Sequence, residues 1–280
     1  MNHLKAEYQV EALAQALEVS PSGYYAHQHK PHGARARQDR QLIPKIQSVF
    51  EESRRTYGSP RIQVVLRRTG ERCGKNRIAR LMRQNHWRAR QKRRFVPRTT
   101  QSNHDQPIAP NWLAQVPAPT RPDQVWVVDI TYIATGEGWV YLAVILDACS
   151  RKVVGWAMAI SLETSLVTEA LRRAQKERRP PPGLLHHSDR GVQYASGAYR
   201  ALLATYQITP SMSRAANPYD NAMAESFMAT LKTECFDHIP TTRAQAKLMV
   251  FEYLETFYNP RRLHSALGYQ SPVEFERQLN

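Results

Sequence analysis

Cysteine is scarce in this 280-residue sequence, and the three that occur lie far apart. Cys73, Cys149 and Cys235 form neither a C-x-x-C pair nor an even set for disulfides, so we interpret them as reduced thiols and expect no structural zinc. Long apolar runs are missing too, since no stretch reaches about 18 residues and the start MNHLKAEYQV lacks a signal-peptide core. We therefore expect no membrane span and a cytoplasmic location.

Acidic residues are rare in the first part of the chain. Residues 1–120 contain 22 lysines and arginines against 8 acidic residues, whereas residues 121–280 contain 17 against 16. Almost all of the net charge of +15 therefore lies in the first 120 residues. A surplus confined to one region is typical of proteins that bind a polyanion, and we interpret it as a nucleic-acid-binding region rather than a merely soluble basic surface.

Short amphipathic helices are predicted in this basic region. Apolar residues recur at helical spacing over residues 8–17 before a Ser-Pro-Ser-Gly break, which predicts a small helix-turn-helix-like segment over residues 1–34. Three further stripes, separated by Gly-containing turns, predict a helix-turn-helix domain over residues 40–100. The stripes consist of Leu42, Ile46, Val49 and Phe50, then Ile62, Val65 and Leu66, then Ile78, Leu81 and Met82.

Arginines crowd the end of this region. The predicted helix KNRIARLMRQNHW carries Arg77, Arg80 and Arg83 on its polar side, and the basic run RARQKRRFVPR that follows includes Arg93 and Arg94. We predict that these five side chains contact DNA; the alternative is an ordinary helical bundle with arginines facing solvent. Residues 101–120 are rich in proline without periodicity, which predicts an extended linker before a second domain over residues 121–280.

After the linker the pattern changes to strands. Val, Ile, Trp and Tyr dominate three runs with short connections, which predict an antiparallel meander over residues 125–133, 139–148 and 153–160. The predicted elements that follow are a helix at 164–178, a strand within GLLHHS, a helix at 197–206, a strand at 208–212 and two long helices. This order resembles the ribonuclease-H-like fold, an α/β (α+β) class with a mixed sheet and flanking helices.

Two carboxylates accompany the predicted strands. Asp129 interrupts an apolar strand, where burial would require a cation or hydrogen-bond donors; on the solvent face of an edge strand it would need neither. Asp189 follows the run GLLHHS, and strand ends in such sheets usually open into clefts. Carboxylate oxygens are the hard ligands that Mg²⁺ prefers, so a third acid nearby would complete a site for a pair of Mg²⁺ ions.

Glu225 is the third candidate, on the predicted helix in NPYDNAMAESFMATLK. Asn217 is the predicted N-cap, with Pro218 at the first helical position and Asp220 in the first turn. This start places Glu225 nearly opposite an apolar stripe, although a solvated helix face would look similar. The stripe consists of Met223, Phe227 and Leu231. Lys232 follows Glu225 by two helical turns on one face, where it could hold a phosphate.

In combination these residues resemble a known signature. Asp129 in WVVDITYI, Asp189 in HHSDRGVQY and Glu225 in NPYDNAMAESF, with 35 residues between the last two, resemble the DDE motif of retroviral integrases and related bacterial transposases. The ending YNPRRLHSALGYQSPVEFE is similar to the C-terminal signature of the Insertion Sequence Three family, specifically its second-frame transposase. The resemblance extends to SPSGYYA and YGSPRI and so covers nearly the whole chain.

The resemblance implies a transposase with a retroviral-integrase-like core. It would bind two Mg²⁺ ions through Asp129, Asp189 and Glu225, with Mn²⁺ able to substitute, and would cleave and transfer DNA strands at insertion-sequence ends. Its partners would be double-stranded DNA, namely the terminal inverted repeats and the target, with Lys232 contacting the terminal DNA. It would act at the bacterial nucleoid as a homodimer or larger assembly, alone or fused to an upstream-frame product.

Other interpretations stay open for several residues. Asp147 could cap a turn or lie near the acids, and His187 could assist Asp189 or be a packed, hydrogen-bonded histidine. A Ser188-His-Asp189 triad is disfavoured because contiguous strand residues cannot converge. Tyr219, Arg261 and Arg262 are further candidates for DNA contact. A nuclease on the same fold and a noncatalytic DNA-binding regulator are the rival functions.

Overall fold

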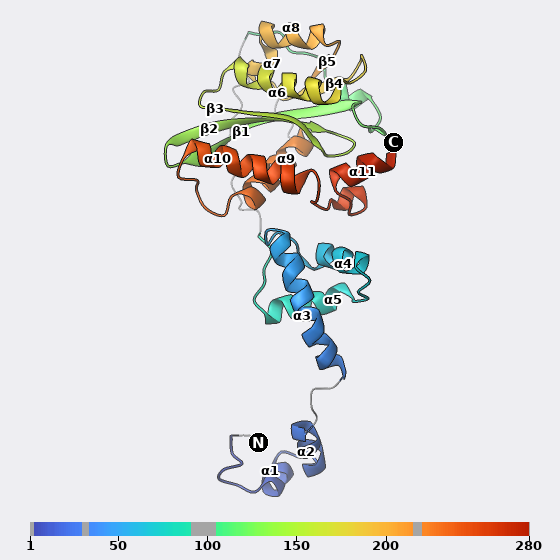
Figure 1. Cartoon of the computed structure of the whole chain (residues 1–280), viewed down its shortest axis with the longest axis vertical. Helices are drawn as coiled ribbons and strands as arrows, with labels where there is room; N and C mark the ends of the chain where they lie inside the picture. The colour runs from blue at the N-terminus through green and yellow to red at the C-terminus, as the bar shows by residue number, and fades with distance from the viewer. Residues whose placement is uncertain (1–2, 30–33, 91–104, 215–219, 280) are drawn as a thin grey trace. The chain divides into compact units, whose positions relative to one another are not determined.

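The computed structural model describes residues 3–29, 34–90, 105–214 and 220–279. The chain divides into two compact units, Met1–Arg88 and Ala89–Asn280, which Figure 1 draws from blue to red along the chain. Within the described ranges, no helix is long and apolar enough to cross a membrane. The finer division predicted from the sequence, with a linker over residues 101–120, remains a prediction.

The first unit is entirely helical. Its buried side chains include Leu42, Ile46 and Phe50 of the long helix α3, so the predicted stripes face a common core. That helix begins at Ala34, earlier than the predicted domain start at residue 40, and continues through Pro44. The helices are α1 Val10–Ala16, α2 Pro21–His29, α3 Ala34–Glu52, α4 Ser59–Arg68 and α5 Lys75–Gln84.

The second unit is built on a mixed five-stranded sheet of order β3-β2-β1-β4-β5. The first three strands form the predicted antiparallel meander, and β4 and β5 then add in parallel to one side of β1. The strands are β1 Val125–Thr135, β2 Gly138–Asp147, β3 Val153–Ala159, β4 Leu185–Ser188 and β5 Thr209–Met212. The predicted fold class, a mixed sheet with flanking helices after a helical region, is confirmed.

Helices cover both faces of this sheet (Figure 1). On one face, α6 (Thr164–Arg178) packs so closely on β3 that a Cβ at Gly155 would lie 2.5 Å from the carbonyl oxygen of Ala170, which explains the glycine there. The short α7 (Val192–Ala195), which was not predicted, and α8 (Gly197–Thr205) complete this layer. The other face is covered by α9 (Ala222–Cys235) and α10 (Arg243–Phe251).

A C-terminal extension braces α9. It consists of a π-helical turn at Glu252–Tyr258, a 3₁₀ turn at Ser265–Leu267 and α11 at Pro272–Leu279. Arg262 donates two hydrogen bonds of 2.6 Å to Glu234 of α9, which also accepts one of 3.0 Å from the hydroxyl of Tyr253. Arg262, one of the further candidates for DNA contact, is thus buried and paired with an acid 28 positions earlier.

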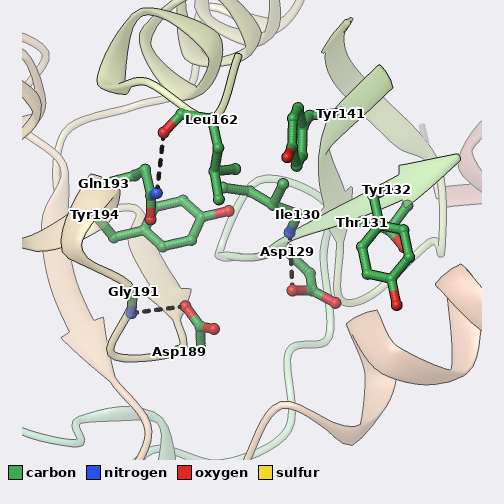
Figure 2. Close-up of a pocket in the computed structure, with 10 residues that line it drawn as sticks. All are labelled: Asp129, Ile130, Thr131, Tyr132, Tyr141, Leu162, Asp189, Gly191, Gln193 and Tyr194. Carbon is green, nitrogen blue, oxygen red and sulfur yellow. Dashed lines mark hydrogen bonds between the residues drawn. The ribbon is translucent and has the colours of Figure 1, made fainter. Parts of the chain in front are cut away.

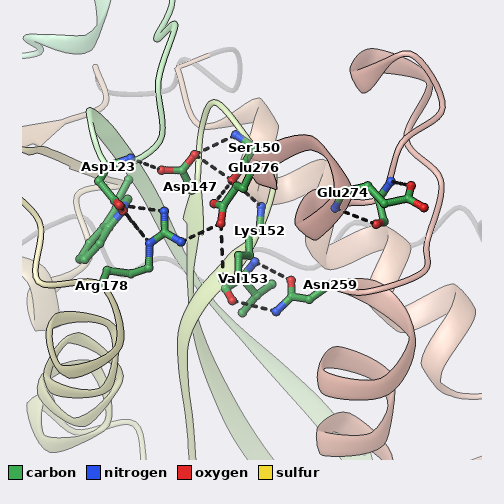
Figure 3. Close-up of polar contacts among 11 residues, drawn as sticks. Asp123, Asp147, Ser150, Lys152, Val153, Arg178, Asn259, Glu274 and Glu276 are labelled. Atoms are coloured by element: carbon green, nitrogen blue, oxygen red, sulfur yellow. Dashed lines mark hydrogen bonds and ion pairs between the residues drawn. The ribbon is translucent and has the colours of Figure 1, made fainter. Parts of the chain in front are cut away.

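A polar network joins the same extension to the sheet (Figure 3). Arg178 at the end of α6 donates to Asp123 before β1 and, at 2.7 Å, to Glu276 of α11. Asp147, at the end of β2, accepts from the backbone amides of Ser150 at 2.8 Å and Asp123 at 2.7 Å. Asp147 thus caps the turn after β2, which was one of its two predicted roles.

The pair between Arg262 and Glu234 gives a stability prediction. Replacing Arg262→Met should lower the free energy of unfolding by about 3–5 kcal/mol, because Glu234 would remain buried without its counter-charge. Urea denaturation measures the change. The double variant Glu234→Gln/Arg262→Met should recover most of the loss, and Arg277→Met, at an exposed arginine of α11, should have little effect. A loss that persists in the double variant would show that packing of Arg262, rather than its charge, matters.

Candidate active site

Asp129 and Asp189 are placed together by the pairing of β1 with β4. The parallel register matches Val125 with Leu185 and Val127 with His187, so Asp129 and Asp189 follow the last pair at the same interval along their chains, and both line one cleft. Because side chains alternate between the faces of a sheet, Asp129 points to the face opposite the one that buries Val128 and Ile130. This is the face that α9 covers.

Backbone amides fix both carboxylates. Asp129 Oδ1 accepts from the amide of Ile130 at 2.8 Å, and Asp189 Oδ1 accepts from the amide of Gly191 at 3.0 Å (Figure 2). Ending β4 at Ser188 allows the chain to turn back through Gly191, where a Cβ would lie only 3.0 Å from the same Asp189 oxygen. The glycine therefore shapes the turn that presents Asp189.

Both aspartates line one cleft of about 240 Å³. Its walls come from β1, from Tyr141 of β2, from Leu162 before α6 and from the turn after β4 (Figure 2). Tyr194 closes part of it, and the buried hydroxyl of this tyrosine has no hydrogen-bond partner among the described residues. The cleft therefore offers an unsatisfied polar atom beside two carboxylates.

Glu225 reaches the same region from α9. That helix begins at Ala222 with Asn221 as its N-cap residue, which is later than predicted; the expected N-cap Asn217 lies outside the described residues, as do Pro218 and Tyr219. Asn221, which sequence reasoning missed, donates from its side-chain amide to the carbonyl oxygen of Val128 at 3.1 Å. This bond anchors the start of α9 directly beside Asp129.

The exposure of α9 agrees with most of its predicted faces. Glu225 is exposed, while Phe227 and Leu231 are buried as expected. Met223, however, is only partly buried, and Ala224 and Met228 take its place in the core. Asp220 lies before the helix instead of in its first turn, and it pairs with Arg214 at 3.0 Å.

The three acids interact electrostatically. Burial, then the negative charge of Asp189 and to a lesser extent that of Glu225, raise the pKa of Asp129 to about 8, while the hydrogen bond from the Ile130 amide and the charge of Lys232 oppose the rise. The pKa of Glu225 is also raised, first by desolvation and then by Asp189. Like charges this close oppose each other's ionisation unless a cation offsets them. The site is therefore electrostatically prepared for positive charge.

Lys232 is a cation that interacts with this set. Its ammonium lies 4.6 Å from the centroid of the Tyr132 ring, over the ring face. Partial burial lowers the pKa of Lys232 and the charge of Asp129 opposes that shift, so the lysine and the acid sense each other. A basic group lies two turns along α9 from Glu225, as the spacing predicted.

The histidines of the β4 segment contribute structure. His187 is buried, with its two ring nitrogens 2.9 Å from the hydroxyl of Ser211 and 3.1 Å from that of Ser213, and burial lowers its pKa to about 4. His186 bonds to the hydroxyl of Tyr199 at 2.8 Å. The arrangement of His187 corresponds to the packed, hydrogen-bonded alternative rather than to a helper of Asp189.

The predicted DNA-contacting arginines differ in their surroundings. Arg77 and Arg80 each donate to Asp39 of α3 at 2.6 Å, which ties α5 to α3 and engages both guanidinium groups within the unit. Arg83 is exposed on α5. Arg93 and Arg94 lie outside the described residues. Of the three predicted arginines on α5, Arg83 is the one whose charge is most available for a contact with DNA, because Asp39 already pairs with the other two.

The donor set of the site suits a hard divalent cation. Among the described residues, no group of three or more acidic, histidine or cysteine ligands is gathered closely enough to hold a metal ion. Asp189 and Glu225 are still close enough to Asp129 for their negative charges to raise its pKa. The chemistry of three carboxylates and the unsatisfied hydroxyl of Tyr194 nevertheless fits Mg²⁺, which takes oxygen ligands and keeps bound waters that need hydrogen-bond acceptors and donors.

Comparison with known proteins decides the family. The integrase core domain family matches residues 119–218 and 206–272, and the HTH-like domain family matches residues 37–95. A 31 kDa protein of insertion element IS600 from Shigella sonnei is 44% identical over 96% of this chain and 98% of its own length. The transposase InsF of insertion sequence IS3A from Escherichia coli K12 is 36% identical over 98% of this chain and 96% of its own length.

The chain belongs to the Insertion Sequence Three family of transposases. A third relative, the transposase of insertion sequence element IS904 from Lactococcus lactis, is 41% identical over 84% of the chain and 93% of its own length. Transposase relatives and an integrase core together assign the chain to DNA transposition and integration, with a polynucleotidyl transferase type of activity on DNA. The family predicted from the acids and the C-terminal signature is thereby confirmed.

Two viral proteins are among the solved structures to which the chain is similar. The simian T-cell lymphotropic virus intasome, in complex with PP2A regulatory subunit B56 gamma, is similar with a TM-score of 0.49 at 14% identity, covering 79% of this chain and 70% of that one. The HTLV-2 integrase catalytic core domain in complex with magnesium gives a TM-score of 0.43 at 15% identity, covering 56% of this chain and 97% of that one.

The raised pKa of Asp129 predicts a pH-dependent stability in metal-free buffer. A carboxyl whose pKa is higher in the folded than in the unfolded state binds its proton more tightly in the fold. The free energy of unfolding therefore falls as the pH rises from about 4 through 8, where the carboxyl must ionise inside the folded protein. Asp129→Asn should therefore raise the free energy of unfolding by about 1–3 kcal/mol at pH 8 and by little at pH 4.

Urea denaturation in EDTA at the two pH values tests this expectation. Asp105→Asn, at an exposed aspartate, is the matched control and should show no such pH-dependent gain. Equal stability of Asp129→Asn and the parent chain at pH 8 would contradict the assigned burial and repulsion.

Proposed function

We propose that the chain cleaves DNA at the ends of its insertion sequence and joins the cut strands to new DNA, using Asp129, Asp189 and Glu225 as its acids. The observation that carries the proposal is that Asp129 and Asp189 line one cleft, with Glu225 near enough to raise the pKa of Asp129. Strand cleavage and joining are both in-line displacements at phosphorus, so a single site serves both reactions.

The roles of the residues follow from their positions. Asp129, Asp189 and Glu225 would hold two Mg²⁺ ions, which when bound would activate the attacking water or DNA 3′-hydroxyl and stabilise the leaving oxygen. The amides of Ile130 and Gly191 orient the two aspartates. Lys232 would bind a phosphate of the terminal DNA, because its charge interacts with Asp129 and its ammonium lies over the Tyr132 ring beside the cleft.

Recognition of DNA is assigned to the basic first region. Residues 40–100 would bind the terminal inverted repeats, with Arg83, Arg93 and Arg94 as the leading contacts and Arg77 and Arg80 contributing less because of Asp39. Residues 101–120 would link this domain to the catalytic core at 121–280. Bringing two element ends and a target together requires at least a dimer. The experiment that follows is run with and without an upstream-frame product, either fused to the chain or added as a separate protein.

A strand-transfer assay tests the proposal. The full chain is incubated with Mg²⁺ and labelled duplexes that carry the two terminal sequences of its own element, and products are separated into nicked and joined strands. We expect both products from the parent chain, and Mn²⁺ should replace Mg²⁺. Asp129→Asn, Asp189→Asn and Glu225→Gln should each lower joining by at least about 10³-fold while binding of the duplex is retained, because positioning and charge stabilisation at the phosphorus would be lost.

The controls separate the rival functions. Asp237→Asn, at an exposed acid beyond the end of α9, should leave both products unchanged. Nicking without joining, with and without an upstream-frame product, would identify a nuclease, and binding without either product would identify a regulator. Full activity in any of the three acid variants would overturn the assigned roles.

A further inference from the structure

An aromatic pair stands beside the acids at the open end of β1. The rings of Tyr132 on β1 and Trp139 on β2 meet edge to face, with centroids 4.7 Å apart and an interplanar angle of 89°. Trp139 is 51% exposed, although its ring is large and apolar. Contact with Tyr132 holds the tryptophan in one orientation, so a flat apolar surface is presented to solvent in a fixed position.

Basic groups flank this pair on both sides. Lys232 lies over the Tyr132 ring at 4.6 Å. Arg243, at the start of α10, donates from its side chain to the carbonyl oxygen of Trp139 at 3.3 Å. Its backbone amide donates to the side chain of Glu137 at 2.8 Å, so the arginine is attached to the hairpin that carries the tryptophan. Aromatic surface with positive charge on either side is the combination that binds single-stranded nucleic acid.

The hairpin itself is held rigidly. The amide of Gly136 donates to the carbonyl oxygen of Pro240 at 2.9 Å, and a Cβ at this glycine would lie 2.5 Å from the carbonyl oxygen of Thr241. The segment after α9 therefore grips the turn between β1 and β2 through close backbone contact. A preorganised aromatic side chain loses little freedom when a ligand stacks on it, which favours binding.

The pair is continuous with the candidate active site. Tyr132 lines the cleft that also contains Asp129 and Asp189, as Figure 2 shows. β4 pairs with β1 only at Val125, Trp126 and Val127, so the part of β1 that carries Tyr132 extends past β4. Tyr132 thus connects the exposed tryptophan to the cleft that contains the two aspartates.

We propose that Trp139, held by Tyr132 and flanked by Lys232 and Arg243, is a stacking site for an unpaired nucleobase next to the phosphate that reacts. The inference rests on the proposed function and adds a feature of the substrate: the DNA end is locally unpaired when it occupies the site. Stacking on a tryptophan is available to any base, so the site favours unpaired over paired DNA without reading sequence. Trp139 is a binding residue and Tyr132 a positioning residue.

Binding to two duplexes tests the proposal. The full chain carrying Asp189→Asn, which prevents chemistry, is titrated with one terminal duplex that is blunt and with the same duplex bearing an unpaired 3′ tail of about four thymidines and a 2-aminopurine. We expect tighter binding of the tailed duplex and quenching of the 2-aminopurine. Adding Trp139→Ala should weaken binding of the tailed duplex by about 5- to 100-fold and leave the affinity for the blunt duplex unchanged.

Two further variants define the cause. Trp139→Phe keeps an aromatic ring and should retain most of the preference for the tail. Leu248→Ala removes a similarly exposed apolar side chain from α10 and should retain all of it. An unchanged preference in Trp139→Ala, or equal losses on both duplexes, would overturn the proposal.

The result is independent of the strand-transfer assay. If the parent chain joins no strands but shows a preference for the tail that depends on Trp139, the stacking site stands and the proposed reaction fails. If joining occurs while Trp139→Ala binds both duplexes like its parent, the reaction stands and the stacking site fails.

Discussion

The short parallel pairing of β4 with β1 is the constraint on which the rest of the second unit depends. Only three residue pairs hold the two strands together, from Val125 with Leu185 to Val127 with His187. Two positions after the last pair in each chain comes an aspartate, Asp129 still within β1 and Asp189 just beyond the end of β4, and both line one cleft. A shift of the register by one residue would turn Asp189 away from Asp129.

Helix α9 combines the demands of chemistry and stability in one element. Its first turn is anchored to β1 by Asn221 and carries Glu225, while its last turn contains Glu234, buried against Arg262. Glu225 is exposed and must be able to approach another charge, whereas Glu234 is buried and must be completely paired. Fixing the helix at both ends defines where Glu225 and Lys232 lie along it.

Much of the fold could be predicted because local patterns report local structure. The three strands of the antiparallel meander follow runs of β-branched and aromatic residues, and the spacing of Asp189 and Glu225 points to the acids. The partners of charged residues could not be predicted, since Asp39 meets Arg77 and Arg80 only after α3 packs on α5. The same holds for the bond from Asn221 to a carbonyl 93 positions earlier.

The side chain of Asn259 has a consequence for the border of the sheet. Its amide accepts from the Val153 N–H at 2.9 Å and donates to the Val153 carbonyl oxygen at 3.0 Å, so it satisfies the outward groups of an edge strand as a neighbouring peptide would (Figure 3). An unpaired edge invites strands from other molecules to add to it. By occupying one pairing position of β3, this asparagine protects the unit from intermolecular sheet extension and hence from aggregation.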